Sequence, residues 1–186
     1  MIRTLALAFA VCAALIVARD PAAAQTKPDP QNTVILTTKD GDVTIRLRPD
    51  LAPKHAAQIK ALVQRKFYDG LTFHRVISGF MAQTGDPQGD GSGGSDLPNV
   101  PAEFSSTPFK RGTVGMARAS DPNSANSQFF ICFADASFLN NQYTVVGDVV
   151  SGMEIIDKVK KGSQANNGAV TAPDKIVKMR LATDPK

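Results

Sequence analysis

The sequence predicts one mainly β domain, a closed antiparallel barrel or a sandwich whose openings are covered by helices. Three observations lead to this prediction. Short runs rich in β-branched and aromatic residues are separated by glycine and proline turns. Only two segments, well apart in the chain, have the spacing of a helix. The 186 residues are 42% hydrophobic and 20% charged, which suits a single domain without repeats.

The first element in the chain is predicted to be a β-hairpin. Residues 32–47 consist of two β-rich runs around Asp40-Gly41, a pair of residues that favours a tight turn. A helix is expected to begin at Pro53, because proline suits the first helical position and apolar residues then recur at helical spacing.

Short strands separated by turns are predicted for most of the remaining chain. A second, short helix is expected from Met153 to Lys160, and an alternating strand over residues 174–182 closes the domain. The intervening strands are expected around Phe73, Phe80, Thr113, Gln128 and Tyr143.

The first 24 residues have the pattern of a secretory signal peptide. Arg3 precedes an apolar run over residues 5–17 that is too short to span a bilayer, and alanines precede an expected cut after Ala24. Residues 25–31 contain two prolines and predict a flexible start, so the folded domain is expected over residues 32–186. We therefore expect a periplasmic or secreted protein with no stable membrane association after cleavage.

Charge and cysteine content restrict the classes of function. The formal net charge of +4 falls to +3 on cleavage, because the signal carries Arg3, Arg19 and Asp20. The remaining basic residues are scattered, whereas a nucleic-acid groove needs them clustered with aromatic residues, so no nucleic-acid partner is expected. Only Cys132 remains after cleavage, so no intrachain disulfide can form. We expect a monomer.

Several motifs that suggest a cofactor or a metal lack the context they need. The glycines of "GDGSGG" (Gly89, Gly91 and Gly94) match a dinucleotide pattern, but prolines follow where a helix is required. The same segment has Leu97 where a calcium loop needs glutamate. It is expected to be a surface loop, and His74 a hydrogen-bonded structural histidine. We expect no cofactor and no metal.

One charged residue stands inside an apolar stretch. In "FHRVISGFMAQTGD", residues 73–86, Arg75 lies between Phe73 and Ile77, and alternate residues of a strand share a face. Arginine is rarely buried without a partner. This stretch alone favours an arginine at a strand edge whose stem covers apolar surface while its head stays in water.

Four stretches, in this order, resemble the cyclophilins, the peptidyl-prolyl cis-trans isomerases. They are "FHRVISGFMAQTGD", "GTVGMARA", "NSANSQFFICFAD" and "FLNNQYTVVGDVVSGMEIID". The resemblance extends roughly from Thr33 to Leu181, and "MARA" with "SANSQFF" is similar to the exported bacterial branch. It implies a closed eight-stranded antiparallel β-barrel capped by two α-helices, with the site on an outer face. It also implies rotation about X–Pro peptide bonds and help in folding exported proteins.

The resemblance also implies the residues of the site. Arg75 matches the catalytic arginine, and Gln83 the glutamine that binds substrate backbone. The partner of Arg75 would then be the substrate. The other implied substrate-binding residues are Phe80, Met81, Ala117, Arg118, Gln128, Phe130, Phe138, Leu139 and Tyr143.

Three of these positions depart from a common family pattern. Arg118 stands where many cyclophilins have asparagine, and Tyr143 where histidine is frequent. Phe138 stands where many eukaryotic members have a tryptophan whose indole N–H binds the inhibitor cyclosporin A, so weak cyclosporin sensitivity is expected.

Two alternatives to an isomerase remain. One is a polypeptide-binding chaperone module that uses the same groove with weak catalysis; the other is a scaffold domain of a larger assembly. Taken singly, each site residue could also be an ordinary core residue or a side chain that hydrogen-bonds a buried backbone group. Their occurrence together, in the family's order, favours the enzyme.

Overall fold

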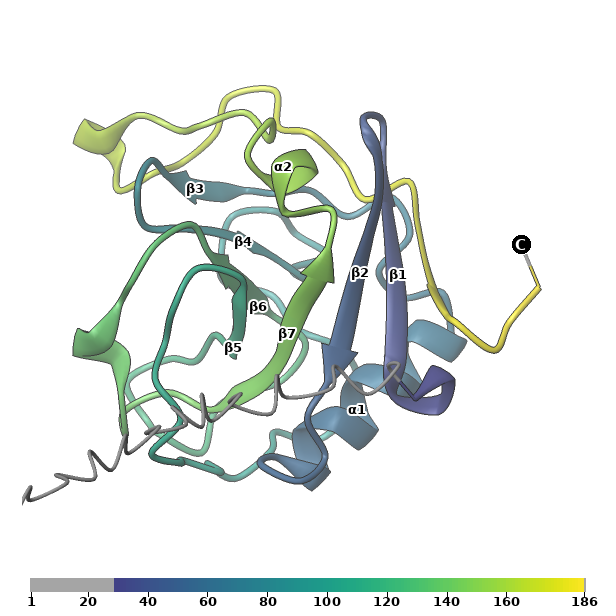
Figure 1. Cartoon of the computed structure of the whole chain (residues 1–186). Coiled ribbons are helices and arrows are strands. Elements are labelled where there is room, and N and C mark those ends of the chain that lie inside the picture. The colour runs from purple at the N-terminus through teal and green to yellow at the C-terminus, as the bar shows by residue number, and fades with distance from the viewer. Residues whose placement is uncertain (1–28, 186) are drawn as a thin grey trace, which may run out of the picture.

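The computed structural model describes residues 29–185, and within them one eight-stranded antiparallel sheet is flanked by two helices (Figure 1). The predicted signal peptide and its cleavage site lie outside these residues. No helix in this part of the chain is both long and apolar enough to cross a membrane. The strands are β1 (Thr33–Thr38), β2 (Gly41–Leu47), β3 (Arg75–Ile77), β4 (Met81–Thr84), β5 (Thr113–Met116), β6 (Phe129–Cys132), β7 (Val145–Ser151) and β8 (Lys178–Leu181). The helices are α1 (Pro53–Gln64) and α2 (Met153–Ile156), with single 3-10 turns η1 (Pro30–Asn32), η2 (Ser137–Leu139) and η3 (Gln164–Asn166).

The predicted hairpin is confirmed as β1 and β2, joined at Lys39 and Asp40. Its register runs from Thr33 opposite Arg46 to Thr38 opposite Gly41. Gly41, the first residue of β2, adopts a φ of +133°, which non-glycine residues rarely tolerate, so the glycine is needed directly after the two loop residues.

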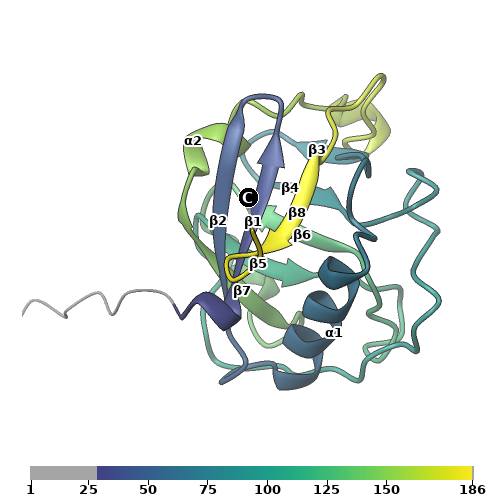
Figure 2. The same cartoon turned by 90° about the vertical axis from the view of Figure 1, so that its right-hand side faces the viewer.

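The expected closed barrel is wrong, because the sheet is an open, curled half-barrel. Its strand order is β3-β4-β6-β5-β7-β2-β1-β8, and the edge strands β3 and β8 lie 18 Å apart. Figure 2 shows β8 beside β1 at one edge. The free edge of β3 pairs instead with an irregular segment: Val76 donates to Gly168 O at 2.8 Å and accepts from Gly162 N at 2.9 Å. Since these bonds occupy β3, no ladder between β3 and β8 can form.

Residues alternate between the two faces of the sheet, so that each face carries its own apolar cluster. The inner face holds the main core, to which β6 contributes Phe129 and Ile131. The outer face holds a smaller cluster, to which β6 contributes Phe130 and Cys132. Because successive side chains of a strand point to opposite faces, a single strand supports both clusters. The smaller cluster forms the base of the site described below.

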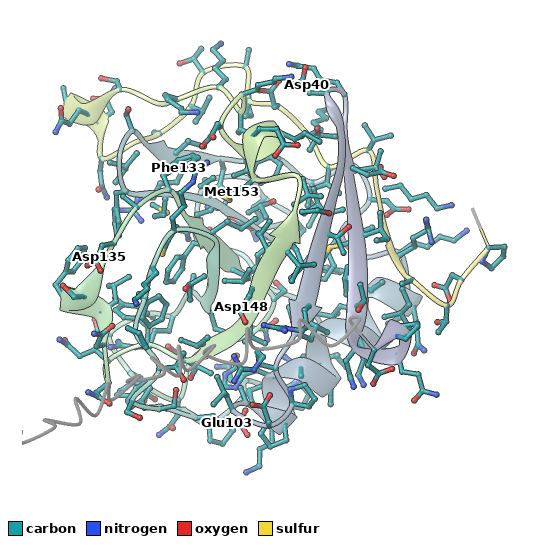
Figure 3. All side chains as sticks on the ribbon, viewed as in Figure 1. Asp40, Glu103, Phe133, Asp135, Asp148 and Met153 are labelled. Carbon is teal, nitrogen blue, oxygen red and sulfur yellow. The ribbon has the colours of Figure 1, made fainter. Side chains whose placement is uncertain are left out.

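The two helices cover opposite ends of the half-barrel. Helix α1 begins at Pro53 as predicted and packs against β7 and β8, while α2 packs against β2. In Figure 3, Glu103 marks the α1 end and Met153 the α2 end. The buried apolar face of α1 carries Ala56, Ile59, Leu62 and Val63.

Helix α2 is shorter than the predicted range of 153–160. Beyond Ile156, the amides of Lys158 and Val159 donate to carbonyls three residues back, which tightens the chain into turns. The amide of Lys160 then donates to the carboxylate of Asp174 at 2.8 Å. This side-chain acceptor replaces the helical carbonyl, so the helix stops.

Candidate active site

Four residues lie in one row across four neighbouring strands of the outer face. Arg75 on β3 is opposite Gln83 on β4, Gln83 is opposite Phe130 on β6, and Phe130 is opposite Gly115 on β5. Cross-strand neighbours of this kind have Cβ atoms about 5 Å apart. The register of the sheet therefore places the guanidinium, an amide and an aromatic ring side by side.

An apolar pocket extends from this row. Its base is the outer-face cluster, in which Met81 is 1%, Phe130 5% and Leu139 7% exposed. The ring of Phe130 stacks on Phe109 with 5.8 Å between centroids and meets Tyr143 edge-on at 5.9 Å. These contacts pack the ring of Phe130 from two sides. The whole cavity, which also has polar walls that include Asp90 and Asn167, has a volume of about 940 Å³.

The guanidinium of Arg75 is held on three sides. Its Nη1 donates to Gln83 Oε1 at 3.1 Å, its Nε to Asn167 O at 3.0 Å, and its Nη2 to Asn167 Oδ1 at 3.0 Å. Partial burial lowers the pKa of Arg75, yet a guanidinium stays protonated at any physiological pH. Arg75 is thus a fixed positive charge at the wall of the pocket.

A chain of amide groups connects Arg75 to the glycine-rich loop. Gln83 Nε2 donates to Gln128 Oε1 at 2.8 Å, and Gln128 Nε2 donates to the carbonyls of Gly91 and Gly93 at 3.0 and 2.8 Å. Since each amide accepts at one end and donates at the other, the chain has a single direction. The orientation of Gln83 toward Arg75 therefore depends on this loop.

The loop itself is wrapped around the buried carboxylate of Asp86. That carboxylate accepts the backbone N–H groups of Gln88, Asp90 and Gly91 at 2.8, 3.1 and 2.6 Å. Burial by itself raises the pKa of Asp86, but these bonds outweigh it and lower the pKa. The segment is therefore an ordered wall, and it lines the pocket with residues 89–92.

The opposite rim is made by Arg118, Tyr143 and Phe138. The guanidinium of Arg118 lies 4.6 Å from the ring centroid of Tyr143, a cation–π geometry. Phe138 on η2 is 63% exposed, and its ring packs against that of Phe80 with 5.2 Å between the centroids. The rim combines a positive charge with an exposed aromatic ring.

The structure brings ten of the eleven residues proposed from the sequence around this one pocket. The exception, Gln128, lines a smaller adjoining pocket of about 170 Å³, which also contains Gln83, Ala117 and Arg118. The residues around the main pocket are Arg75, Phe80, Met81, Gln83, Ala117, Arg118, Phe130, Phe138, Leu139 and Tyr143.

Sequence reasoning missed two further segments that line the pocket. One is the glycine-rich loop, which the sequence suggested only as a surface loop. The other contains Asn166, Asn167, Ala169 and Val170, which reach the pocket because this segment covers the free edge of β3. An "Asn-Asn-Gly" turn, which lies outside the four family motifs, offers no local signal of that contact.

Two expectations about the stretch around Arg75 are wrong. Phe73 does not share a face with Arg75 and Ile77, because β3 begins only at Arg75 and the preceding chain is irregular; Phe73 is fully buried in the main core. His74 is 6% exposed, and neither ring nitrogen has a hydrogen-bond partner in the described protein. Burial lowers the pKa of His74 and so favours the neutral ring.

The cysteine within residues 29–185 lies beneath this pocket and does not line it. Cys132 is fully buried in the outer-face cluster, and burial raises the pKa of its thiol to about 12. Over residues 29–185, His, Cys, Asp and Glu side chains do not gather in groups of three or more that could hold a metal ion. The arrangement instead offers a fixed cation, orienting amides and an apolar pocket.

Comparison with known sequences identifies relatives along nearly the whole described chain. The family model for cyclophilin-type peptidyl-prolyl cis-trans isomerases matches residues 33–181. A protein from Brucella suis named probable peptidyl-prolyl cis-trans isomerase is 60% identical over 190 residues, covering 95% of this chain and 97% of the relative. A Helicobacter pylori peptidyl-prolyl cis-trans isomerase is 38% identical over 131 residues, 68% of this chain and 80% of that protein.

Solved structures share the fold. A cyclophilin from Hirschia baltica aligns with a TM-score of 0.77 at 30% identity, covering 86% of this chain and 77% of that one. A cyclophilin-type isomerase from Cryptosporidium parvum, crystallised in the presence of the dipeptide Ala-Pro, aligns with a TM-score of 0.74 at 28% identity. That alignment covers 82% of this chain and 99% of the other.

Proposed function

This chain belongs to the cyclophilin-type peptidyl-prolyl cis-trans isomerases, which act on proline-containing peptides, and we propose that its reaction takes place in the pocket beside Arg75. The observation that carries the proposal is a guanidinium with unused N–H groups at the wall of an apolar pocket. Arg75 has five N–H groups, and its three hydrogen bonds leave one on each Nη. The Ala-Pro dipeptide present with the Cryptosporidium parvum relative is consistent with a pocket that takes proline.

The chemistry of the reaction matches these groups. Resonance gives the C–N bond of an X–Pro peptide partial double-bond character, with a barrier of about 18–20 kcal/mol to rotation. No covalent bond breaks, so the enzyme has only to bind the twisted state more tightly than either planar state. In the twisted state the prolyl nitrogen becomes pyramidal and regains a lone pair that can accept a hydrogen bond.

Arg75 is the donor in this mechanism. Its charge does not change over the physiological pH range, and its planar fork presents the unused N–H groups in a fixed direction. Gln83 orients the guanidinium through its Oε1 atom and can also contact the substrate backbone. Phe80, Met81, Phe130 and Leu139 hold the proline ring while the carbonyl side of the bond rotates.

The remaining rim residues bind the rest of the peptide. Ala117 and Arg118 lie where the main pocket joins the smaller one, so an extended substrate can continue from one pocket into the other. Gln128 forms part of the smaller pocket, and Phe138 with Tyr143 forms the wall beside the proline. An exposed aromatic rim also suits a chaperone that binds polypeptides without rapid catalysis.

Arginine substitutions separate these two functions. In a proline-isomerisation assay, Arg75→Ala should lower kcat/KM by roughly 10²-fold or more, by analogy with the loss of an oxyanion donor. Arg75→Lys should also be impaired, since an ammonium lacks the planar fork. Arg180→Ala, on β8 at the far edge of the sheet, is the matched control and should keep full activity. Near wild-type turnover in Arg75→Ala would refute the catalytic role.

We further propose that the protein is exported and assists the folding of exported proteins as a monomer. The support is the signal-peptide pattern of the first 24 residues and the slow exchange of X–Pro bonds, which can limit folding. N-terminal sequencing of the protein from a periplasmic or secreted fraction should begin at Gln25. A soluble cytoplasmic form that retains Met1 would exclude this location.

A further inference from the structure

The backbone and side chain of Asn167 make two of the three hydrogen bonds that hold the Arg75 guanidinium. The carbonyl of Asn167 accepts from Nε, and its Oδ1 atom accepts from Nη2, both at 3.0 Å. The third bond, from Nη1 to Gln83, comes from the opposite side of the guanidinium fork. We propose that Asn167 is a positioning residue for the isomerase reaction, an inference that rests on the proposed catalytic role of Arg75.

The geometry of these bonds explains why both acceptors are needed. The bond to Gln83 alone would leave the guanidinium free to turn about that contact. Two oxygens of Asn167 accept hydrogen bonds from Nε and Nη2. Together they restrain the plane of the guanidinium, as a bidentate partner does. The two N–H groups that remain, one on each Nη, are then held in one orientation relative to the pocket.

Asn167 itself lies in a tight turn whose backbone angles suit few residue types. It has a φ of +51°, in the left-handed region that asparagine tolerates better than most residues, and Gly168 follows with a φ of +81°. A Cβ atom at Gly168 would lie 2.5 Å from Ile77 Cγ1, so the turn is pressed against β3. The Asn-Gly pair thus permits the turn and supplies the acceptor.

Backbone bonds to β3 and to the residue before it anchor the segment on both sides of Asn167. Val76 donates to Gly168 O at 2.8 Å and accepts from Gly162 N at 2.9 Å, and Val170 N donates to His74 O at 3.0 Å. These bonds occupy the edge that a closed barrel would give to another strand. Because this edge of the half-barrel is open, Asn167 can lie beside Arg75 although 92 positions separate them in the sequence.

The test measures the exchange rate of a bound peptide and its affinity separately, for example by NMR line-shape analysis of a proline peptide at increasing enzyme concentration. Asn167→Gly removes Oδ1 but tolerates the left-handed backbone. It should lower the on-enzyme exchange rate about 10-fold, which is less than the ~10²-fold that a 1 Å misplacement can cost. The peptide Kd should change by less than about twofold, since the apolar residues expected to hold the proline ring remain. Asn167→Asp restores an oxygen acceptor and should exchange faster than Asn167→Gly.

Two controls separate positioning from other effects. Ala165→Gly loosens the same segment in η3 without removing an acceptor and should leave the exchange rate unchanged. An equal loss in Ala165→Gly and Asn167→Gly, no loss in Asn167→Gly, or an Asn167→Asp rate no higher than that of Asn167→Gly would each overturn the proposal. Arg75→Ala in the same assay tests the underlying role. If Arg75→Ala is slow while Asn167→Gly is normal, only the positioning role fails.

Discussion

Phe130 and Gly115 face each other across β6 and β5, and a Cβ atom at position 115 would lie 2.4 Å from Cζ of Phe130. The same Cβ atom would lie 2.6 Å from Cε1 of Phe109, which stacks on Phe130. The missing side chain at Gly115 therefore provides the space in which the two rings pack. The depth of the pocket depends on this one small residue.

Gly115→Ala should consequently displace the base of the pocket. The added methyl group overlaps both rings, and relieving the overlap pushes Phe130 toward the space where the proline ring would bind. We expect the Kd for a proline peptide to rise at least about 10-fold, together with a stability loss of about 1–3 kcal/mol from overpacking. Peptide titration and urea unfolding measure the two effects.

Gly147→Ala is the matched control for this substitution. Its Cβ atom would lie 2.7 Å from the carbonyl oxygen of Arg46, on the β2–β7 pair and away from the pocket. This variant should lose stability while the folded fraction binds peptide normally. Unchanged peptide affinity in a folded Gly115→Ala variant would show that Phe130 does not limit the pocket.

Phe138→Trp should increase cyclosporin A affinity. The exposed Phe138 ring supplies an apolar wall without a hydrogen-bond donor, so an inhibitor carbonyl buried against it lacks a partner. The cost is about 1–3 kcal/mol, or about one to two orders of magnitude in affinity. We expect weak inhibition of the unmodified protein and tighter inhibition of the tryptophan variant, with similar turnover.

Inhibitor titrations during the isomerase assay test this prediction. Phe104→Trp is the control, because Phe104 is also an exposed phenylalanine, at 41%, but does not line the pocket. Tight inhibition of the unmodified protein, or equal inhibition of the Phe138→Trp variant and its parent, would assign drug binding to another rim residue such as Tyr143.

The stability of the fold should decrease on acidification below pH 6.5. Burial lowers the pKa of both His55 and His74 below the ordinary value of 6.5, so the unfolded chain binds more protons than the folded one in this range. The free energy of unfolding then falls as pH falls, by up to about 1.4 kcal/mol per pH unit for each histidine. Urea unfolding between pH 7.5 and 5 measures the slope.

The contribution of His55 can be isolated by His55→Asn. Its ring Nδ1 lies 2.6 Å from Glu103 Oε2, and the same carboxylate accepts the amides of Lys54 and His55 at the start of α1. Asparagine keeps an N–H donor for Glu103 but does not titrate. The variant should show a shallower pH slope whatever its absolute stability, and a slope equal to that of the parent would contradict a proton-binding difference at His55.

Local sequence patterns predicted the β1–β2 turn and the start of α1, because these depend on residues that are adjacent in the sequence. Asp40-Gly41 predicted the β1–β2 turn because glycine accepts a backbone angle closed to other residues. Pro53 predicted the start of α1 because a proline at the first helical position loses no hydrogen bond. The motifs around Arg75, Gln83 and Phe130 indicated the family, and with it most of the residues around the pocket.

The tertiary structure alone decided whether the sheet closes and what completes the site. Whether β3 pairs with β8 depends on competition for one strand edge, and that edge is taken by the segment around Gly168. The partnership of Arg75 with Asn167 follows from that competition, since it joins residues far apart in sequence whose local patterns carry no sign of each other. Local conformation is set by each residue and its neighbours, whereas edge pairing is set by which distant segment occupies the open hydrogen bonds of the strand in the folded chain.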